Sequence, residues 1–294
     1  MPRRAVVDGV DVVGSLSPSR AGDFMTCPLL YRFRTVDRLP EPSSPDAVRG
    51  TVVHKVLEDL FDLPAAGRTP ARAAELLEPA WEAVLAAEPE IAEMFGDGGP
   101  EIGSWLASCR ESLERYFSLE DPTRLEPAER ELYVETVLES KLLLRGFIDR
   151  IDVAPTGEIR VVDYKTGRAP HPAFEAKALF QMKFYALVLW RTRGVVPRML
   201  QLVYLGSGEV LRYAPTEQEL EATERKVVAL WAAVRRAAET GDWRASPSRL
   251  CDWCHHRPLC PSFGGTPPPV PVDAVRRASG AEAGRVAAPG RDED

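Results

Sequence analysis

The segment 141–167 constrains the fold of this chain more than any other, because two β-strand patterns flank one turn sequence. Alternating and β-branched apolar residues run along both sides of Pro155-Thr156-Gly157, a pattern typical of a β-hairpin. With the turn centred near Thr156, Asp149 and Asp163 each lie seven residues from it. We therefore expect the two carboxylates to face each other across the hairpin, at roughly 5 Å between Cα atoms.

A lysine belongs to the same patch. Lys165 is two residues beyond Asp163, so strand alternation places both side chains on one face. A divalent cation would relieve the repulsion between two close carboxylates and acidify a water molecule, while the lysine could stabilise charge on a phosphate. From the spacing alone, however, a surface hairpin with solvated charges is the favoured interpretation, because Arg150, Asp152 and Glu158 also lie here.

Composition narrows the class of protein. The 294 residues are 45% hydrophobic and 28% charged, as in globular proteins with a sizeable core, and the length allows two domains or one elaborated domain. No apolar run approaches the roughly 20 residues of a membrane helix. Because Asp8 and Asp11 interrupt the apolar N-terminus, we expect a cytoplasmic protein without membrane contact. The net charge of −7 confines any nucleic-acid contact to a local patch.

The chain divides into one long domain with irregular ends. We expect a flexible leader at 1–14 and a main domain at 15–263. Within that domain, an Ala-, Glu- and Leu-rich segment at about 65–125 predicts a helical insertion. Residues 264–294, rich in Pro, Gly, Ala and Arg, are expected to be disordered.

The five cysteines favour metal ligation over disulfides, because an odd number in a cytosolic chain does not make a disulfide framework. Cys251-x2-Cys254-x5-Cys260, together with Cys27, offers four thiolates. Zinc and iron–sulfur clusters both accept such a set. Cys109 is most simply a buried free thiol.

The hairpin motifs, GFIDRID followed by VVDYKTG, resemble the core of the PD-(D/E)XK nucleases, in particular the RecB-like exonuclease family. In that family the first aspartate and the Asp-x-Lys pair bind metal and catalyse hydrolysis. The resemblance therefore implies that Asp149 and Asp163 bind Mg²⁺ or Mn²⁺ and that Lys165 assists catalysis.

Three further motifs match in the family's order. Gly50 and His54 match a Gly-x-x-x-His helix whose histidine binds the metal, and Gln181 and Tyr185 match a catalytic Gln-x-x-x-Tyr helix, on which both side chains share one face. Ser17-Pro18-Ser19 and Cys27-Pro28 match the opening segment. Without the resemblance, His54 is more simply a structural histidine and Tyr185 as simply a core residue. An imidazole ligand would favour manganese somewhat over magnesium.

The cysteine pattern is similar to that of the iron–sulfur subgroup of RecB-like nucleases, which includes the AddB nuclease domain and CRISPR-associated members. One early and three late cysteines hold a 4Fe–4S cluster there. The resemblance implies that Cys27, Cys251, Cys254 and Cys260 bind such a cluster, which clasps the N- and C-terminal segments together. Zinc is the less favoured occupant.

The resemblance implies an α/β, restriction-endonuclease-like core with a central mixed sheet flanked by helices. The activity implied is a metal-dependent exonuclease on single-stranded or frayed DNA ends in DNA repair and recombination. The chain has no Walker A motif, so a helicase partner would supply any unwinding. The alternative from another class is a non-catalytic, cluster-stabilised DNA-end-binding module. Arg32, Arg34 and Arg38, beside Tyr31 and Phe33, are a candidate strand-binding patch, although such arginines are usually just solvated.

Overall fold

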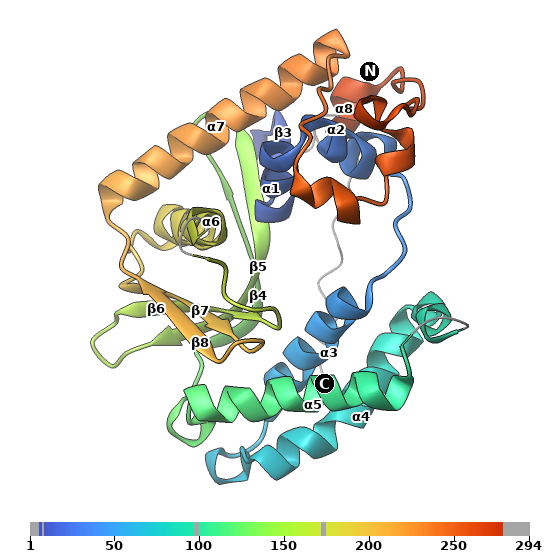
Figure 1. Cartoon of the computed structure of the whole chain (residues 1–294). Helices are drawn as coiled ribbons and strands as arrows, with labels where there is room; N and C mark the ends of the chain where they lie inside the picture. The colour runs from blue at the N-terminus through green and yellow to red at the C-terminus, as the bar shows by residue number, and fades with distance from the viewer. Residues whose placement is uncertain (1–5, 8, 97–99, 172–174, 279–294) are drawn as a thin grey trace.

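A mixed six-stranded sheet forms the centre of the computed structural model, which describes residues 6–7, 9–96, 100–171 and 175–278 (Figure 1). Its strands are β3 (Gly14–Leu16), β4 (Glu129–Val137), β5 (Leu142–Val153), β6 (Ile159–Lys165), β7 (Met199–Tyr204) and β8 (Glu209–Tyr213). Their order is β3-β5-β6-β7-β8, with β4 also paired to β5. The β3–β5 and β6–β7 pairs are parallel and the other pairs are antiparallel. The expected central mixed sheet is confirmed.

Strand β5 has three partners, and this arrangement opens the sheet at one point. β4 covers one edge of β5 over residues 143–151, so β3 and β6 share the other edge, at 142–144 and 150–153. Residues 145–149, all within the described part of the chain, pair with neither of these two strands. The sheet therefore forks between β3 and β6, beside Asp149.

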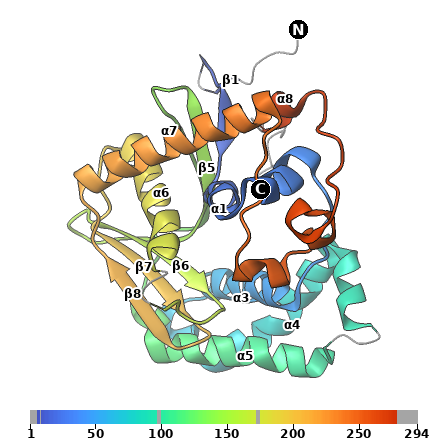
Figure 2. The same ribbon diagram turned by 45° about the horizontal axis from the view of Figure 1, so that its top comes forward.

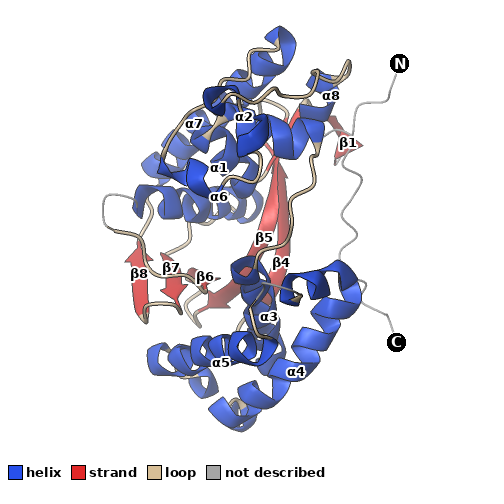
Figure 3. Ribbon diagram, turned by 45° about the vertical axis from the view of Figure 1, so that its right-hand side comes forward, coloured by secondary structure: helices blue, strands red, loops and turns tan. Residues whose placement is uncertain are grey.

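Helices cover both faces of the sheet because both faces are apolar. Along β6, Ile159 and Val161 belong to one buried cluster, and Val162 and Tyr164 to the other, as strand alternation requires. The first cluster includes residues of α1 (Pro18–Thr26), α6 (Glu175–Arg193) and α7 (Glu217–Thr240), and the second includes residues of α3 (Pro45–Leu60), α4 (Pro70–Ala87) and α5 (Ile102–Leu119). Figures 2 and 3 show these two helical layers on opposite sides of the sheet.

Residues 65–125, where the sequence predicts a helical insertion, contain α4 and α5, which pack on α3 and on each other. Trp81, Phe95 and Trp105 join these elements, with ring centroids 5.1 to 5.5 Å apart. The remaining elements are β1 (Val6–Val7), β2 (Val10–Asp11), α2 (Pro28–Tyr31), a π-helix (Arg32–Asp37), α8 (Ala274–Ala278) and short 3-10 helices at Ala65–Gly67, Pro89–Phe95, Pro122–Arg124, Arg249–Trp253, Arg257–Leu259 and Pro261–Phe263. No helix in the described residues combines the length and apolar character needed to cross a bilayer.

The described residues of the expected leader (6–7 and 9–14) and of the expected tail (264–278) form defined contacts. In the leader, β1 pairs with β2, and the N–H of Val13 donates to the carbonyl of Lys141 at 2.9 Å. In the tail, the Tyr31 hydroxyl donates to the carbonyl of Ala278 at 2.7 Å. Sequence patterns miss these contacts because the acceptors are backbone carbonyls, which every residue carries. The parts of both expectations that fall on residues 1–5, 8 and 279–294 lie outside the described residues.

Candidate active site

Three carboxylates occupy one row across three neighbouring strands. The β4–β5 register joins Arg130 to Arg150 and Leu132 to Ile148, so Glu131 stands opposite Asp149. The β5–β6 register ends at Arg150 and Val162, so the next position places Asp163 opposite Asp149 on the other side. The predicted alignment of Asp149 with Asp163 agrees with this register.

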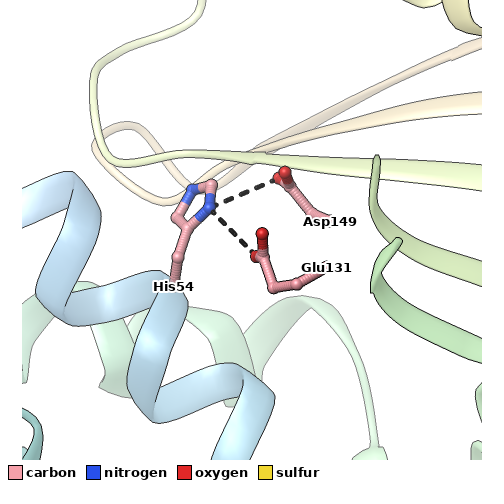
Figure 4. Close-up of side chains that lie close together, drawn as sticks. All are labelled: His54, Glu131 and Asp149. Atoms are coloured by element: carbon pink, nitrogen blue, oxygen red, sulfur yellow. Dashed lines mark ion pairs between the residues drawn. The ribbon is translucent and has the colours of Figure 1, made fainter. Parts of the chain in front are cut away.

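His54 reaches this row from α3 (Figure 4). Its Nε2 lies 3.0 Å from the carbonyl oxygen of Tyr164. Because a carbonyl only accepts hydrogen bonds, Nε2 carries the proton in the neutral ring, and Nδ1 keeps a free lone pair. Nδ1 lies 3.6 Å from Asp149 Oδ2 and 3.8 Å from Glu131 Oε1. Ligand atoms of these three residues lie within 4.8 Å of one another, so the donor set fits a divalent cation.

The peptide groups of Tyr164 hold both Asp149 and His54 in place. The N–H of Tyr164 donates to Asp149 Oδ2 at 2.7 Å, and its carbonyl oxygen accepts from His54. The Tyr164 ring is itself buried, and its hydroxyl accepts a hydrogen bond from Arg150. Arg150 in turn forms a buried ion pair with Glu120 at 2.8 Å. The supporting shell of the site therefore extends into the core.

Asp163, Lys165 and Gln181 form a closed ring of contacts beside the row. Lys165 Nζ lies 2.7 Å from Asp163 Oδ2 and donates to Gln181 Oε1 at 3.1 Å. Gln181 Nε2 donates to Asp163 Oδ1 at 2.9 Å and to the Tyr185 hydroxyl at 3.4 Å. Tyr185 fits here because Gly146 has no side chain, since a Cβ on Gly146 would lie 2.8 Å from the tyrosine ring.

The site carries more negative charge than its own cations balance. Burial, and secondly the neighbouring carboxylate of Asp163, together raise the pKa of Asp149 to about 7. Burial lowers the pKa of His54, but the carboxylates of Asp149, Glu131 and Asp163 outweigh this effect and raise it to about 9. Both shifts indicate a site that takes up positive charge, as protons or as a metal ion.

The structure brings together all six residues that the sequence singled out here: His54, Asp149, Asp163, Lys165, Gln181 and Tyr185. Asp163 lies outside the compact group of possible ligands, where Glu131 stands instead. Sequence reasoning missed Glu131. Its backbone φ of 43° is unusual for a non-glycine residue, and such outliers cluster at functional sites.

The four cysteines that the sequence analysis assigns to a cluster line one pocket beside α2: Cys27, Cys251, Cys254 and Cys260. Backbone N–H groups point at two of the sulfurs, from Ser246 to Cys27 at 3.4 Å and from Ser248 to Cys251 at 3.3 Å. No three of the four sulfurs lie within 4.8 Å of one another. Cys109 is buried elsewhere, in the helical layer of α3 to α5, and burial raises the pKa of its thiol to about 11.

The candidate strand-binding patch is wrong for four of its five residues, Tyr31, Arg32, Phe33 and Arg34. Tyr31 and Phe33 are buried in the core. Arg32 pairs with Asp37 at 3.0 Å, and Arg34 pairs with both Asp23 and Glu41. The segment folds as a packed helix, so its aromatic rings point inward and Arg32 and Arg34 serve structural ion pairs, while Arg38, just after the helix, is exposed.

Comparison with known proteins places this site in a family. The chain is 28% identical to the gene 69 protein of Mycobacterium phage D29 over 199 residues, which cover 61% of this chain and 70% of that protein. It is 22% identical to the gene 69 protein of Mycobacterium phage L5 over 285 residues, covering 84% and 96%. Among solved structures it is similar to SSO0001, with a TM-score of 0.38 and 16% identity over 86% of this chain and 89% of that one.

A family model matches far more of the chain than the hairpin alone. The model of the PD-(D/E)XK nuclease superfamily matches residues 15–261, a range that includes every residue of the site described above. Membership implies a nuclease that depends on a divalent metal, and the His54, Glu131 and Asp149 group is of the kind that binds one. The chain belongs to the PD-(D/E)XK nuclease superfamily.

Proposed function

We propose that this protein is a metal-dependent DNA exonuclease that hydrolyses phosphodiester bonds at single-stranded or frayed ends. The observation that carries the proposal is the row of three carboxylates beside His54 Nδ1, with Lys165 paired to the outermost aspartate. His54, Asp149 and Glu131 would hold Mg²⁺ or Mn²⁺, and Asp163 would add a fourth ligand from the far side of Asp149. The bound metal supplies Lewis-acid activation of water and neutralises phosphate charge.

The side chains of the chain itself perform the remaining tasks. Asp163 and Gln181 hold the ammonium group of Lys165 in a fixed position, from which it can stabilise charge developing on a phosphate oxygen. The carbonyl of Tyr164 keeps the proton of His54 on Nε2, so that Nδ1 faces the carboxylates. Tyr185 supports Gln181 through its hydroxyl. The site is thus preorganised before substrate arrives.

The preference for DNA ends, a role in repair and recombination, and a helicase partner are supported by the resemblance to RecB-like nucleases. A direct test compares a linear single strand with a covalently closed circle of the same sequence, each incubated with manganese or magnesium. An exonuclease degrades the linear strand and spares the circle. Cleavage of both at equal rates would contradict end-dependence. Binding of linear DNA without cleavage by wild type would favour the non-catalytic end-binding module instead.

We also propose that Cys27, Cys251, Cys254 and Cys260 bind a 4Fe–4S cluster. The four cysteines line one pocket, and their pattern along the chain is similar to that of the iron–sulfur subgroup of RecB-like nucleases. Such a cluster would join α1 and α2 to the C-terminal segment, and its binding energy would contribute to folding.

Cys254→Ser is expected to lose iron and acid-labile sulfide after anaerobic purification and to unfold at a lower temperature than wild type. Cys109→Ala is the matched control, because Cys109 lies away from the pocket, and it should retain iron at the wild-type level. Zinc in place of iron in the anaerobically purified wild type would contradict the cluster. Equal iron content in Cys254→Ser and wild type would remove that cysteine from the ligand set.

A further inference from the structure

A groove leads from the outside of the molecule to the candidate active site. It lies between α1 and the β4–β5 hairpin, at the fork where residues 145–149 of β5 are paired with neither β3 nor β6. Gln181 and Tyr185, which belong to the candidate active site, line it. Arg20, Arg145, Tyr133 and Phe147 also line it, and the active-site mechanism uses none of these four.

The two arginines of the groove are cations without carboxylate partners. Among the described residues, neither Arg20 nor Arg145 forms an ion pair, and the buried Nη1 of Arg20 has no hydrogen-bond partner. Burial lowers the pKa of Arg20, and the nearby charge of Arg145 lowers it further. Arg145 interacts with the Tyr133 side chain rather than with a carboxylate. In a chain with 44 acidic and 37 basic residues, two neighbouring guanidinium groups without a described carboxylate in ion-pair contact point to a bound anion.

The two aromatic residues stand next to the carboxylate row. Tyr133 faces Phe147 across β4 and β5, with ring centroids 5.2 Å apart, and Tyr133 is 37% exposed. Each ring is two residues along its strand from Glu131 or Asp149, which is a step of about 7 Å. The exposed Tyr133 ring and the half-buried Phe147 ring, beside these two arginines, match the chemistry of an unpaired nucleotide, which offers a flat base and a phosphate.

We propose that this groove guides one unpaired DNA strand to the carboxylate row, an inference that rests on the proposed nuclease function. Tyr133 and Phe147 stack on bases, and Arg20 and Arg145 bind backbone phosphates. A duplex does not offer the same contacts, because its base faces are covered by neighbouring base pairs. The groove would therefore select single strands and frayed ends before any chemistry occurs.

The test measures binding separately from cleavage. Every variant is made in the Asp163→Asn background, so that the probe is not consumed, and is titrated against fluorescein-labelled oligo(dT) by anisotropy at several salt concentrations. Tyr133→Leu should weaken binding about tenfold or more at every salt concentration, while Tyr133→Phe, which keeps the ring, should restore it. Arg145→Gln should reduce the slope of log K against log salt by about 0.7, the effect of one lost phosphate contact.

Arg236→Gln provides the matched control, because Arg236 is exposed on α7 and does not line the groove. It should bind as its parent does. Thermal unfolding identifies variants that fold, and Arg145→Gln carries the test if Tyr133→Leu does not fold. Parent-like binding by both groove variants would overturn the proposal, as would equal weakening of single-stranded and blunt duplex probes by Tyr133→Leu. Cleavage is measured separately, with the protein that retains Asp163. If that protein does not cleave DNA, the nuclease function is contradicted, while the binding titrations still test the groove.

Discussion

Asp163→Asn is expected to reduce metal-dependent cleavage of single-stranded DNA by at least about 10²–10³-fold. Asparagine has the same shape, and its oxygen can still accept from Gln181, which now bonds Asp163 at 2.9 Å. It lacks the charge that pairs with Lys165 at 2.7 Å and that would help to hold a cation. The loss should therefore arise from electrostatics, with the fold intact.

Initial rates on an end-labelled linear strand, measured with saturating manganese, provide the comparison. Glu158→Gln serves as the control, because Glu158 is an exposed carboxylate at the tip of the same hairpin, and it should cut at the wild-type rate. Lys165→Met removes the cation of the same ion pair, and it should reduce the cleavage rate by a factor of the same order. An Asp163→Asn protein that cuts within a few-fold of wild type would exclude Asp163 from the chemistry.

Asp149→Asn is expected to make the metal-free protein more stable and to remove its stabilisation by metal. The pKa of Asp149 rises from 3.8 to about 7 in the fold, so between these values the folded protein holds a proton that the unfolded chain has released. The free energy of unfolding therefore falls as pH rises through this window. The pKa of His54 rises from 6.5 to about 9, so the stability that this group contributes is lost between those values. The free energy of unfolding of the metal-free wild type should thus fall as the pH rises from acid to alkaline values.

Thermal unfolding across this pH range, with and without manganese, measures the effect. Metal at about 100 times its Kd should add about 2.7 kcal/mol to the free energy of unfolding of wild type, with a larger shift at higher pH, where protons no longer compete. In Asp149→Asn the pH dependence below neutrality and the metal shift should both disappear. The asparagine oxygen can still accept from the N–H of Tyr164, so local structure is retained. Equal metal shifts in both proteins would mean that the cation binds elsewhere.

The sequence is most informative where a recognisable turn fixes the register. Pro155-Thr156-Gly157 is such a turn, and counting outward from it aligns Asp149 with Asp163. The same count from Ser140 aligns Glu131 with Asp149, nine residues on either side. That turn is hidden because it contains neither glycine nor proline, and Lys141 takes the left-handed conformation there with a φ of 63°.

Other parts of the site depend on contacts between segments that no local pattern links. The approach of α3 to β6 brings His54 to the carbonyl of Tyr164, 110 residues away in the chain, and only the family resemblance pointed to it. The groove depends on two strands sharing one edge of β5, which is a property of sheet order. The pairing of the arginines was equally hidden: Arg32 and Arg34 form ion pairs, whereas Arg20 and Arg145 form none within the part of the chain that the structure describes.

The edge of β5 that β3 and β6 share also sets an order of assembly during synthesis. β3 leaves the ribosome early, but its partner residues 142–144 follow more than a hundred residues later. The carbonyl of Ala278, which accepts the hydrogen bond from the Tyr31 hydroxyl, is synthesised 247 residues after Tyr31. Such distant pairings form late in folding. Because β3, β5 and β6 all lie within residues 14–165, the fork beside Asp149 can form only after the chain has been synthesised as far as β6, well after β3 itself.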